Sequence, residues 1–320
     1  ERNFKDPDQL IRLIADLQSL AMSCPASVPL FISVDQEGGR VARLKSPFSN
    51  FPQPSCLGQA QSESLAYRFG LALGREMKVV GINMVYAPVL DVNTNPANPI
   101  IGTRALSDIP KLAGRMGKAV IDGIKAAGVF PVGKHFPGHG DTDRDSHLEL
   151  PYVNREVDSL EKIELEPFIQ TISHGMQIIM TAHVIYSAWD DQLPATFSPF
   201  ILKSILREKL GFDGLIITDD LEMKAVEKHI SFESIPRLGS IAGVDLYLIC
   251  HDRKKTLSLQ DQMVKDIEEG KIKKKQVECS VQKIIDFKNK IALSPHGEEN
   301  IFDLARDHIE LIREMESYLP

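Results

Sequence analysis

The chain has 320 residues, of which 43% are hydrophobic and 25% are charged, a composition typical of a folded globular protein. Its formal net charge is −7, which argues against a nucleic-acid-binding protein, because such proteins usually present a basic face. No stretch reaches the roughly 18 uncharged apolar residues that a membrane-spanning helix needs, so we expect no membrane span. The one basic block, residues 271–275, is interpreted as the solvated start of a helix.

The four cysteines are scattered along the chain and form no CxxC pair, so the sequence does not indicate a zinc ribbon or a thioredoxin-like site. We expect free, buried thiols, which favour a reducing compartment, and we therefore predict a cytoplasmic protein. The chain opens at Glu1 without an initiator methionine. We expect the natural N-terminus to lie upstream, and whether it carries a cleaved signal stays open.

Short apolar runs of strand length alternate with helical patterns along the chain. The runs are rich in Val and Ile and apolar on both faces, as buried parallel strands are, and they cover residues 30–35, 81–88, 129–136, 177–184, 214–220 and 244–250. Helical patterns cover residues 6–21, 62–80, 109–127, 159–173, 199–210 and 234–242. This alternation predicts an α/β fold with a parallel sheet.

Charged or histidine side chains follow the ends of several predicted strands, at Asp35, Asp91, His135, His183 and Asp219. Such an arrangement is typical of the active face of a (β/α)8 barrel, and the glycine-rich phosphate loops of doubly wound sheets are absent from the sequence. We predict a single-domain (β/α)8 TIM-type barrel over residues 1–290, followed by a helical extension, residues 291–320, that packs on it. Only six strands can be assigned, so we expect one or two strands upstream of Glu1 or within residues 293–302.

The segment 134–147 contains three histidines and three aspartates within fourteen residues, beginning at a strand end. His135, His139 and His147 are each competent metal ligands, so a metal-dependent hydrolase that also uses Asp219 is one interpretation. A polar surface loop with capping aspartates is the structural alternative.

A second polar cluster follows the strand predicted at 214–220. We expect Asp220 to cap the next helix and Asp219 to point into the mouth of the barrel. A carboxylate there, facing a protonatable group, suits retaining glycoside hydrolysis, in which the nucleophile and the acid/base lie roughly 5–5.5 Å apart.

Together these segments resemble glycoside hydrolase family 3, and within it the β-N-acetylglucosaminidase (β-hexosaminidase) branch. The resemblance rests on residues 35–43, 134–147 and 218–223, and it is supported by residues 86–92, 101–104, 182–186 and 210–214. These blocks occur in the family's order and at its spacing, over residues 1 to about 290.

The resemblance implies a role for individual residues. Asp219 matches the nucleophile, His147 matches the acid/base of this branch, and Asp145 matches the partner of that histidine. The positions that match those holding the sugar are Asp35, Arg43, Arg104, Lys134 and His135, and Met223 is expected near the acetamido group. The structural alternative to direct sugar contact is that Arg43, Arg104 and Lys134 form ion pairs with Asp35 or Asp91.

The chemistry of these side chains agrees with the implied roles. An imidazole with a pKa near 6.5 can donate and then accept a proton close to neutrality, and Asp145 can fix its tautomer. Gly138 and Gly140 are expected to make the loop mobile.

We therefore expect a monomeric enzyme that removes terminal GlcNAc from peptidoglycan fragments, with no metal and no cofactor. A metal-dependent hydrolase and a non-catalytic sugar-binding barrel remain the alternatives.

Overall fold

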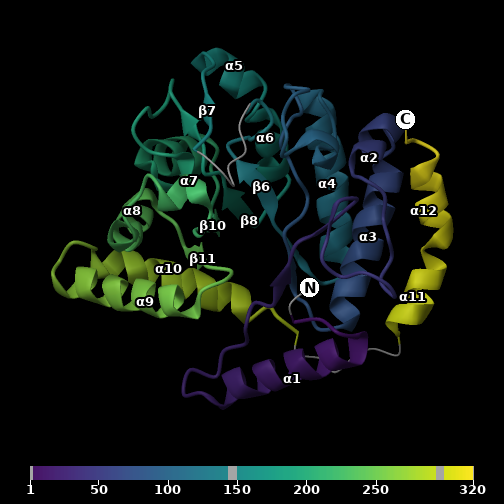
Figure 1. Ribbon diagram of the computed structural model, residues 1–320, viewed down its shortest axis with the longest axis horizontal. Coiled ribbons are helices and arrows are strands. Elements are labelled where there is room, and N and C mark those ends of the chain that lie inside the picture. The colour runs from purple at the N-terminus through teal and green to yellow at the C-terminus, as the bar shows by residue number, and fades with distance from the viewer. Residues whose placement is uncertain (1–2, 143–149, 293–298, 320) are drawn as a thin grey trace. The chain divides into compact units, whose positions relative to one another are not determined.

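The structure, a computed structural model, describes residues 3–142, 150–292 and 299–319 (Figure 1). The chain divides into two compact units. The first comprises Glu1–Leu90, Thr103–Gly133 and Ile285–Pro320, and the second comprises Asp91–Gly102 and Lys134–Ile284. Within the described ranges, no helix is both long and apolar enough to cross a bilayer.

The first unit is built on a parallel sheet of three short strands in the order β1-β4-β5. These are β1 (Ser33–Val34), β4 (Met84–Val85) and β5 (Phe130–Pro131). Buried Asn83 links the first two strands, because its side chain accepts from the Ile32 N–H and donates to the Leu30 carbonyl. A small antiparallel hairpin of β2 (Gln36–Gly38) and β3 (Val41–Ala42) follows β1.

The described helices that share a core in this unit are α1 (Pro7–Ser23), α2 (Ser55–Ala60), α3 (Glu63–Val79), α4 (Pro110–Ala126), α11 (Ile301–Asp307) and α12 (Ile309–Glu316). The sequence encodes their starts: Asp6 caps α1 by accepting from the Gln9 N–H, and Ser62 caps α3 by accepting from the Leu65 N–H. The apolar residues of α11 and α12 join the same core as α2, α3 and α4. Figure 1 shows α12 running beside α2 and α3, which it contacts.

Helices α3 and α4 approach so closely that glycine is required between them. A Cβ added to Gly123 would lie 2.2 Å from the Tyr67 carbonyl oxygen, and one added to Gly70 would lie 2.2 Å from the Val120 carbonyl oxygen. Both distances are well below van der Waals contact, so a larger residue would force the two helices apart.

The second unit carries a four-stranded sheet in the order β11-β10-β8-β6. Its strands are β6 (Gly133–Phe136), β8 (Ile178–Thr181), β10 (Leu215–Asp220) and β11 (Leu246–Leu248). Strand β10 lies parallel to β8 and β11, and Ile217 pairs with Met180 in the register. Parallel strands in this register place Asp219 and His183 at the same C-terminal edge of the sheet.

Shorter elements complete the second unit. A two-stranded parallel pair consists of β7 (Tyr152–Val153) and β9 (Ile185–Tyr186). The helices are α5 (Val157–Lys162), α6 (Glu166–Ser173), a π-helix (Phe200–Lys209), α7 (Lys224–Glu227), α8 (Ile235–Ala242), α9 (Arg253–Glu268) and α10 (Lys274–Lys288), whose last turn belongs to the first unit. Single 3-10 turns occur at Ala195–Phe197 and Phe232–Ser234, and another, Gly102–Arg104, lies at a boundary between the two units in the sequence.

All six predicted strands and the parallel arrangement are confirmed, and each predicted helix is present. Two helical predictions are interrupted: the helix predicted at 159–173 breaks before Glu166, and the described part of the helical extension predicted at 291–320 is divided at His308 into α11 and α12. Buried His308 contacts Glu76 at 2.9 Å, so this break brings a polar side chain to an internal partner. Over the described residues the strands form separate sheets, and the expected closed barrel is not seen. The single-domain boundaries stay a prediction.

The contact between α3 and α4 leads to a stability prediction. We expect Gly123→Ala to lower the free energy of unfolding by about 1–3 kcal/mol, because the added methyl group must displace backbone atoms. Urea denaturation measures the change. The control is Ala126→Ser, which alters an exposed position of the same helix and should stay within about 0.5 kcal/mol of the wild type. An equal effect of both changes would show that the close approach does not limit stability.

Candidate active site

The carboxylate of Asp219 lies at the end of β10, with its side chain 25% exposed. Its Oδ2 is 4.0 Å from His135 Nε2, and its Oδ1 accepts a hydrogen bond of 2.7 Å from the Asp220 N–H. Burial by itself would raise the pKa of Asp219, but the neighbouring His135 and His183 and this N–H hold the pKa below its ordinary value. The side chain is therefore an ionised carboxylate at neutral pH, as a nucleophile must be.

His135 is held in place by Asp91, whose side chain is fully buried. Asp91 Oδ2 accepts from His135 Nδ1 at 2.6 Å, and its Oδ1 accepts from the backbone N–H groups of His135 and His139 at 3.0 and 2.7 Å. Burial opposes the charge of Asp91, yet the contacts with His135 outweigh it and lower the pKa to about 2. Since Asp91 occupies Nδ1, the other ring nitrogen of His135 faces Asp219.

His183 lies at the same edge of the sheet, two residues after the end of β8. Its ring is almost completely buried, with Nε2 3.2 Å from the Asp220 carbonyl oxygen and Nδ1 2.8 Å from Thr196 Oγ1. Burial lowers its pKa despite the nearby Asp219, so the imidazole is neutral at neutral pH. Sequence reasoning assigned this residue no role, although its place at a strand end pointed to the site.

The first half of the 134–147 segment is fixed by packing. A Cβ on Gly138 would meet Glu164 Cβ at 2.8 Å, and a Cβ on Gly140 would meet the Val92 carbonyl oxygen at 1.6 Å. The Tyr186 hydroxyl donates to the Gly138 carbonyl. These glycines therefore allow close contact in this structure, a different role from the loop mobility expected of them.

Two charged side chains behind this segment, Arg155 and Glu164, were not singled out from the sequence. Arg155 donates from Nε to Asp141 Oδ2 at 2.7 Å, and its guanidinium is 3.8 Å from Glu164. Glu164 is 1% exposed, and within residues 3–142, 150–292 and 299–319 no side-chain or backbone donor pairs with either of its carboxyl oxygens. Burial raises the pKa of Glu164 to about 7.

The remaining predicted sugar-binding residues fall into two groups. Lys134, His135 and Met223 lie in the second unit and are all buried, whereas Asp35, Arg43 and Arg104 lie in the first unit.

In the first unit, Arg104 forms a buried bidentate pair with Glu37, at 2.8 and 2.9 Å. The ion-pair alternative named Asp35 or Asp91 as the partner of Arg104, so the pairing with Glu37 was not predicted. Asp35 instead lies 3.9 Å from Arg43, whose side chain is half exposed.

His147 and Asp145 lie outside the described residues. Their roles as acid/base and partner therefore stay predictions, and so does a metal site that includes His147.

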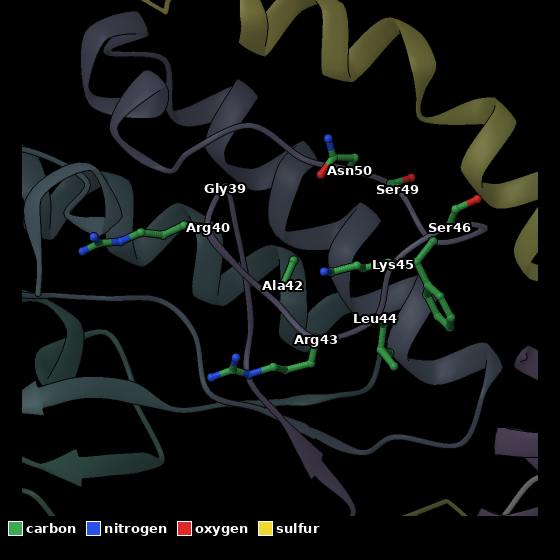
Figure 2. A pocket seen from close by; sticks show the side chains of 10 residues that line it. Gly39, Arg40, Ala42, Arg43, Leu44, Lys45, Ser46, Ser49 and Asn50 are labelled. Carbon is green, nitrogen blue, oxygen red and sulfur yellow. The ribbon is translucent and has the colours of Figure 1, made fainter. Parts of the chain in front are cut away.

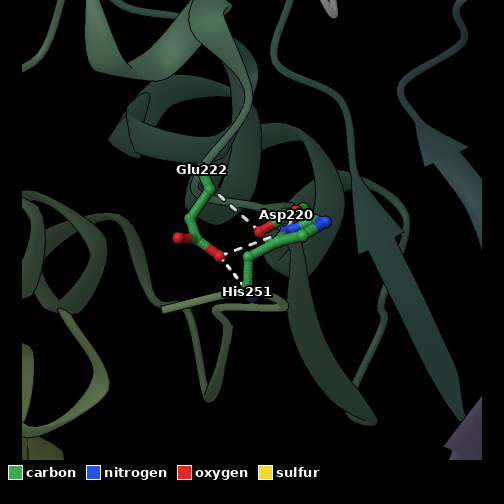
Figure 3. A group of neighbouring side chains, drawn as sticks. All are labelled: Asp220, Glu222 and His251. Atoms are coloured by element: carbon green, nitrogen blue, oxygen red, sulfur yellow. Dashed lines mark hydrogen bonds and ion pairs between the residues drawn. The ribbon is translucent and has the colours of Figure 1, made fainter. Parts of the chain in front are cut away.

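Asp220 does not cap the next helix, which begins at Lys224 with Met223 at its N-cap position. Its Oδ1 accepts instead from the backbone N–H groups of Glu222 and Cys250. Figure 3 shows Asp220 and Glu222 converging on His251, whose Nδ1 is 3.3 Å from an oxygen of each. Glu222 also accepts from the N–H groups of His251 and Asp252, just before α9, so this cluster fixes the start of that helix.

Comparison with known proteins assigns the chain to a family. Residues 1–287 match the model of the glycosyl hydrolase family 3 N terminal domain. The chain belongs to this family. It is 34% identical over 314 residues to beta-hexosaminidase A of Pseudoalteromonas piscicida, covering 91% of this chain and 52% of that protein. It is 38% identical over 257 residues to the beta-hexosaminidase of Nitrosomonas eutropha, covering 78% of this chain and 72% of that protein.

A solved structure supports the same family assignment. The glycoside hydrolase family 3 beta-N-acetylglucosaminidase from Paenibacillus sp. str. FPU-7 superimposes with a TM-score of 0.92 at 36% identity, covering 99% of this chain and 61% of that one. This family 3 chain thus spans about half to three fifths of these two longer relatives.

The buried Glu164 leads to a pH-dependent prediction. Its folded-state pKa of about 7 lies above the ordinary value of 4.5, so the folded protein holds a proton that the unfolded chain has lost. Stability should therefore fall as pH rises between these two values. We expect Glu164→Gln to unfold at a higher temperature than the wild type at pH 8 and at a similar temperature at pH 4.5, measured by circular dichroism.

The matched control is Asp158→Asn, which removes an exposed carboxylate from the preceding helix and should not change the pH dependence. A difference between Glu164→Gln and wild type that is the same at both pH values would contradict the raised pKa.

Proposed function

We propose that this family 3 chain is a retaining exo-β-N-acetylglucosaminidase that acts through a covalent glycosyl-enzyme on Asp219. The observation that carries the proposal is an ionised, partly exposed carboxylate at a strand end, 4.0 Å from a histidine that a buried aspartate orients. The names of the relatives from Pseudoalteromonas, Nitrosomonas and Paenibacillus support the choice of β-N-acetylglucosaminide as substrate.

In the first step, the Asp219 carboxylate attacks the anomeric carbon while His147 protonates the leaving oxygen. In the second step, neutral His147 takes a proton from water, and that water releases the sugar from Asp219. Asp145 stabilises the imidazolium that donates this proton in the first step and forms again in the second step. An imidazole is suited to both steps because its unperturbed pKa lies near 6.5.

We propose that the side chains named by the family resemblance bind the non-reducing sugar. His135 can donate to a sugar hydroxyl from Nε2, because Asp91 already accepts from Nδ1. Lys134 adds a buried cation that also helps to keep Asp219 ionised. Arg104, oriented by Glu37, together with Asp35 and Arg43, supplies the contacts from the first unit. Met223 completes this set, against the acetamido group.

We further propose that the strands belong to a (β/α)8 barrel formed by residues 1–290, with residues 291–320 as a helical extension. The parallel pairing of strands within the two sheets and the likeness to the Paenibacillus structure support this. Terminal GlcNAc on peptidoglycan fragments is the proposed natural substrate, and a cytoplasmic monomer the proposed form. The four cysteines all lie in the described part of the chain and form no disulfide there, which agrees with a reducing compartment, although Cys24, Cys250 and Cys279 are exposed and Cys56 alone among them is buried as expected.

An assay with aryl glycosides tests the function. We expect release of the aryl group from the β-N-acetylglucosaminide and little release from the β-glucoside. Asp219→Ala should lower kcat/KM by at least ~10³-fold, because the covalent step loses its nucleophile. The control Asp213→Asn removes an exposed carboxylate near the start of β10 and should keep wild-type activity.

Other results would point to the alternatives. Activity that survives in Asp219→Ala would contradict the assigned nucleophile. Activity that a chelator abolishes would favour the metal-dependent hydrolase. Sugar binding without any turnover would favour the non-catalytic barrel.

A further inference from the structure

A cavity of about 450 Å³, here called the β11 cavity, lies in the second unit at the N-terminal end of β11. Its lining residues come from the π-helix, α8, α9, α10 and residues 243–247, and all of them belong to this unit. Asp219 lies near the C-terminal end of the neighbouring parallel strand β10, so the cavity is at the other end of these strands. Its volume falls in the range of roughly 300–1,000 Å³ that is usual for small-molecule sites.

The charged side chains of the β11 cavity are mainly cationic. Lys203, Arg207 and Lys283 line it, and Asp245 alone among its described lining residues is acidic. Asp245 is already engaged, because its Oδ2 accepts from Arg207 Nη2 at 2.9 Å and its Oδ1 accepts from the Ser280 hydroxyl. This pairing balances the charge of Arg207 and leaves the two lysines.

Neither lysine is balanced by the protein itself. Within residues 3–142, 150–292 and 299–319, no carboxylate pairs with Lys203 or Lys283 and no acceptor takes a hydrogen bond from either amine. Both side chains are partly buried. A partly buried cation without an opposite charge nearby is unfavourable, so an anion in this cavity would be stabilised by both amines.

The rest of the lining is largely apolar. It includes the side chains of Val244, Met263, Val277, Val281 and Ile284. Val281 remains 46% exposed, although burial of such a side chain is favourable. An inorganic ion would leave this surface uncovered, whereas an organic anion with an apolar body could cover it while its head pairs with the lysines.

Contacts between elements hold the walls of the cavity in place before any ligand binds. The Gln276 side chain on α10 donates to the Ser240 carbonyl on α8, and the Ser280 hydroxyl on α10 donates to Asp245. Asp245 also accepts from the Ile216 N–H of β10 at 2.9 Å. Helix α10 is therefore tied to α8 and to the start of β11, which preorganises the cavity.

The first unit contains a cavity of about 500 Å³ that also has cationic side chains, Arg40, Arg43 and Lys45 (Figure 2). There, however, Arg43 lies 3.9 Å from Asp35, and Arg40 and Lys45 also make contacts within the protein. Because these cations have partners, the β11 cavity is the one whose charge points to a bound anion.

We propose that the β11 cavity is a binding site for a small organic anion with an alkyl body. Its carboxylate or phosphate head pairs with Lys203 and Lys283, and its alkyl body covers the apolar wall that includes Val281. The site is separate from the proposed catalytic carboxylate, and its occupancy can be measured without turnover.

Four probes with the same eight-carbon chain test the proposal by calorimetric titration of the whole chain: octanoate, octyl phosphate, 1-octanol and octylammonium. We expect both anions to bind at least about tenfold more tightly than 1-octanol, and octylammonium to bind more weakly than 1-octanol, because the amines attract one charge and repel the other. The tighter of the two anions identifies the head group that the site prefers.

Substitutions assign the binding to the two lysines. Lys203→Met and Lys283→Met keep most of the side-chain stem, and each should weaken octanoate binding about tenfold while 1-octanol binding stays within about twofold. Lys203→Arg keeps the charge and should retain most of the affinity. The matched control is Lys275→Met, which removes an exposed cation of α10 outside the cavity lining and should leave octanoate binding unchanged.

Cys279 reports where the anion binds, because its exposed thiol belongs to the cavity lining. Saturating octanoate should slow the alkylation of Cys279 by iodoacetamide severalfold, measured by mass spectrometry of the labelled peptides. Cys24, which is exposed in the first unit, should react at an unchanged rate.

Three outcomes would overturn the proposal. One is that octanoate fails to bind, or binds no more tightly than octylammonium. Another is that Lys203→Met and Lys283→Met bind octanoate as the wild type or Lys275→Met does. The third is that octanoate leaves the labelling of Cys279 unchanged or slows that of Cys24 equally.

Discussion

The buried carboxylate of Asp91 positions the histidine that faces Asp219 in the second unit. It accepts the ring N–H of His135 and the backbone N–H groups of His135 and His139, so it joins the end of β6 to the loop that follows. A fully buried carboxylate is unfavourable without such partners, and burial would raise the pKa of Asp91, but the contacts with His135 hold it low. Removing Asp91 would therefore release both the histidine that faces Asp219 and the loop.

The surrounding histidines determine how charge is distributed near Asp219. Burial lowers the pKa of His139 to about 4 and lowers that of His183 as well, so both rings are neutral at physiological pH. Lys134 remains as a nearby buried cation, and the Asp220 N–H binds Asp219 directly. The carboxylate is thus kept ionised while its side chain stays partly exposed, a combination that suits attack on a sugar.

The sequence predicted those features of the site that follow from local pattern. Buried strands ending in polar residues indicated that His135 and Asp219 would lie on one face, because the C-terminal ends of parallel strands lie along one edge. Pairings between distant segments were missed. Glu37 and Arg104 are 67 residues apart, and Asp91 and His135 are 44 apart, so only tertiary packing selects these partners. Asp220 was wrongly expected to cap a helix, since that helix starts three residues later than the pattern implied and other backbone groups take its carboxylate.

The covalent intermediate offers the most direct test of the central claim that Asp219 is the nucleophile. The enzyme would be incubated with a 5-fluoro derivative of N-acetylglucosaminyl fluoride, which slows the second step, then digested with pepsin and analysed by tandem mass spectrometry. The account predicts one added sugar residue on the peptide that contains Asp219, and none in Asp219→Ala. A label on another carboxylate, or turnover of the substrate with no covalent species, would contradict it.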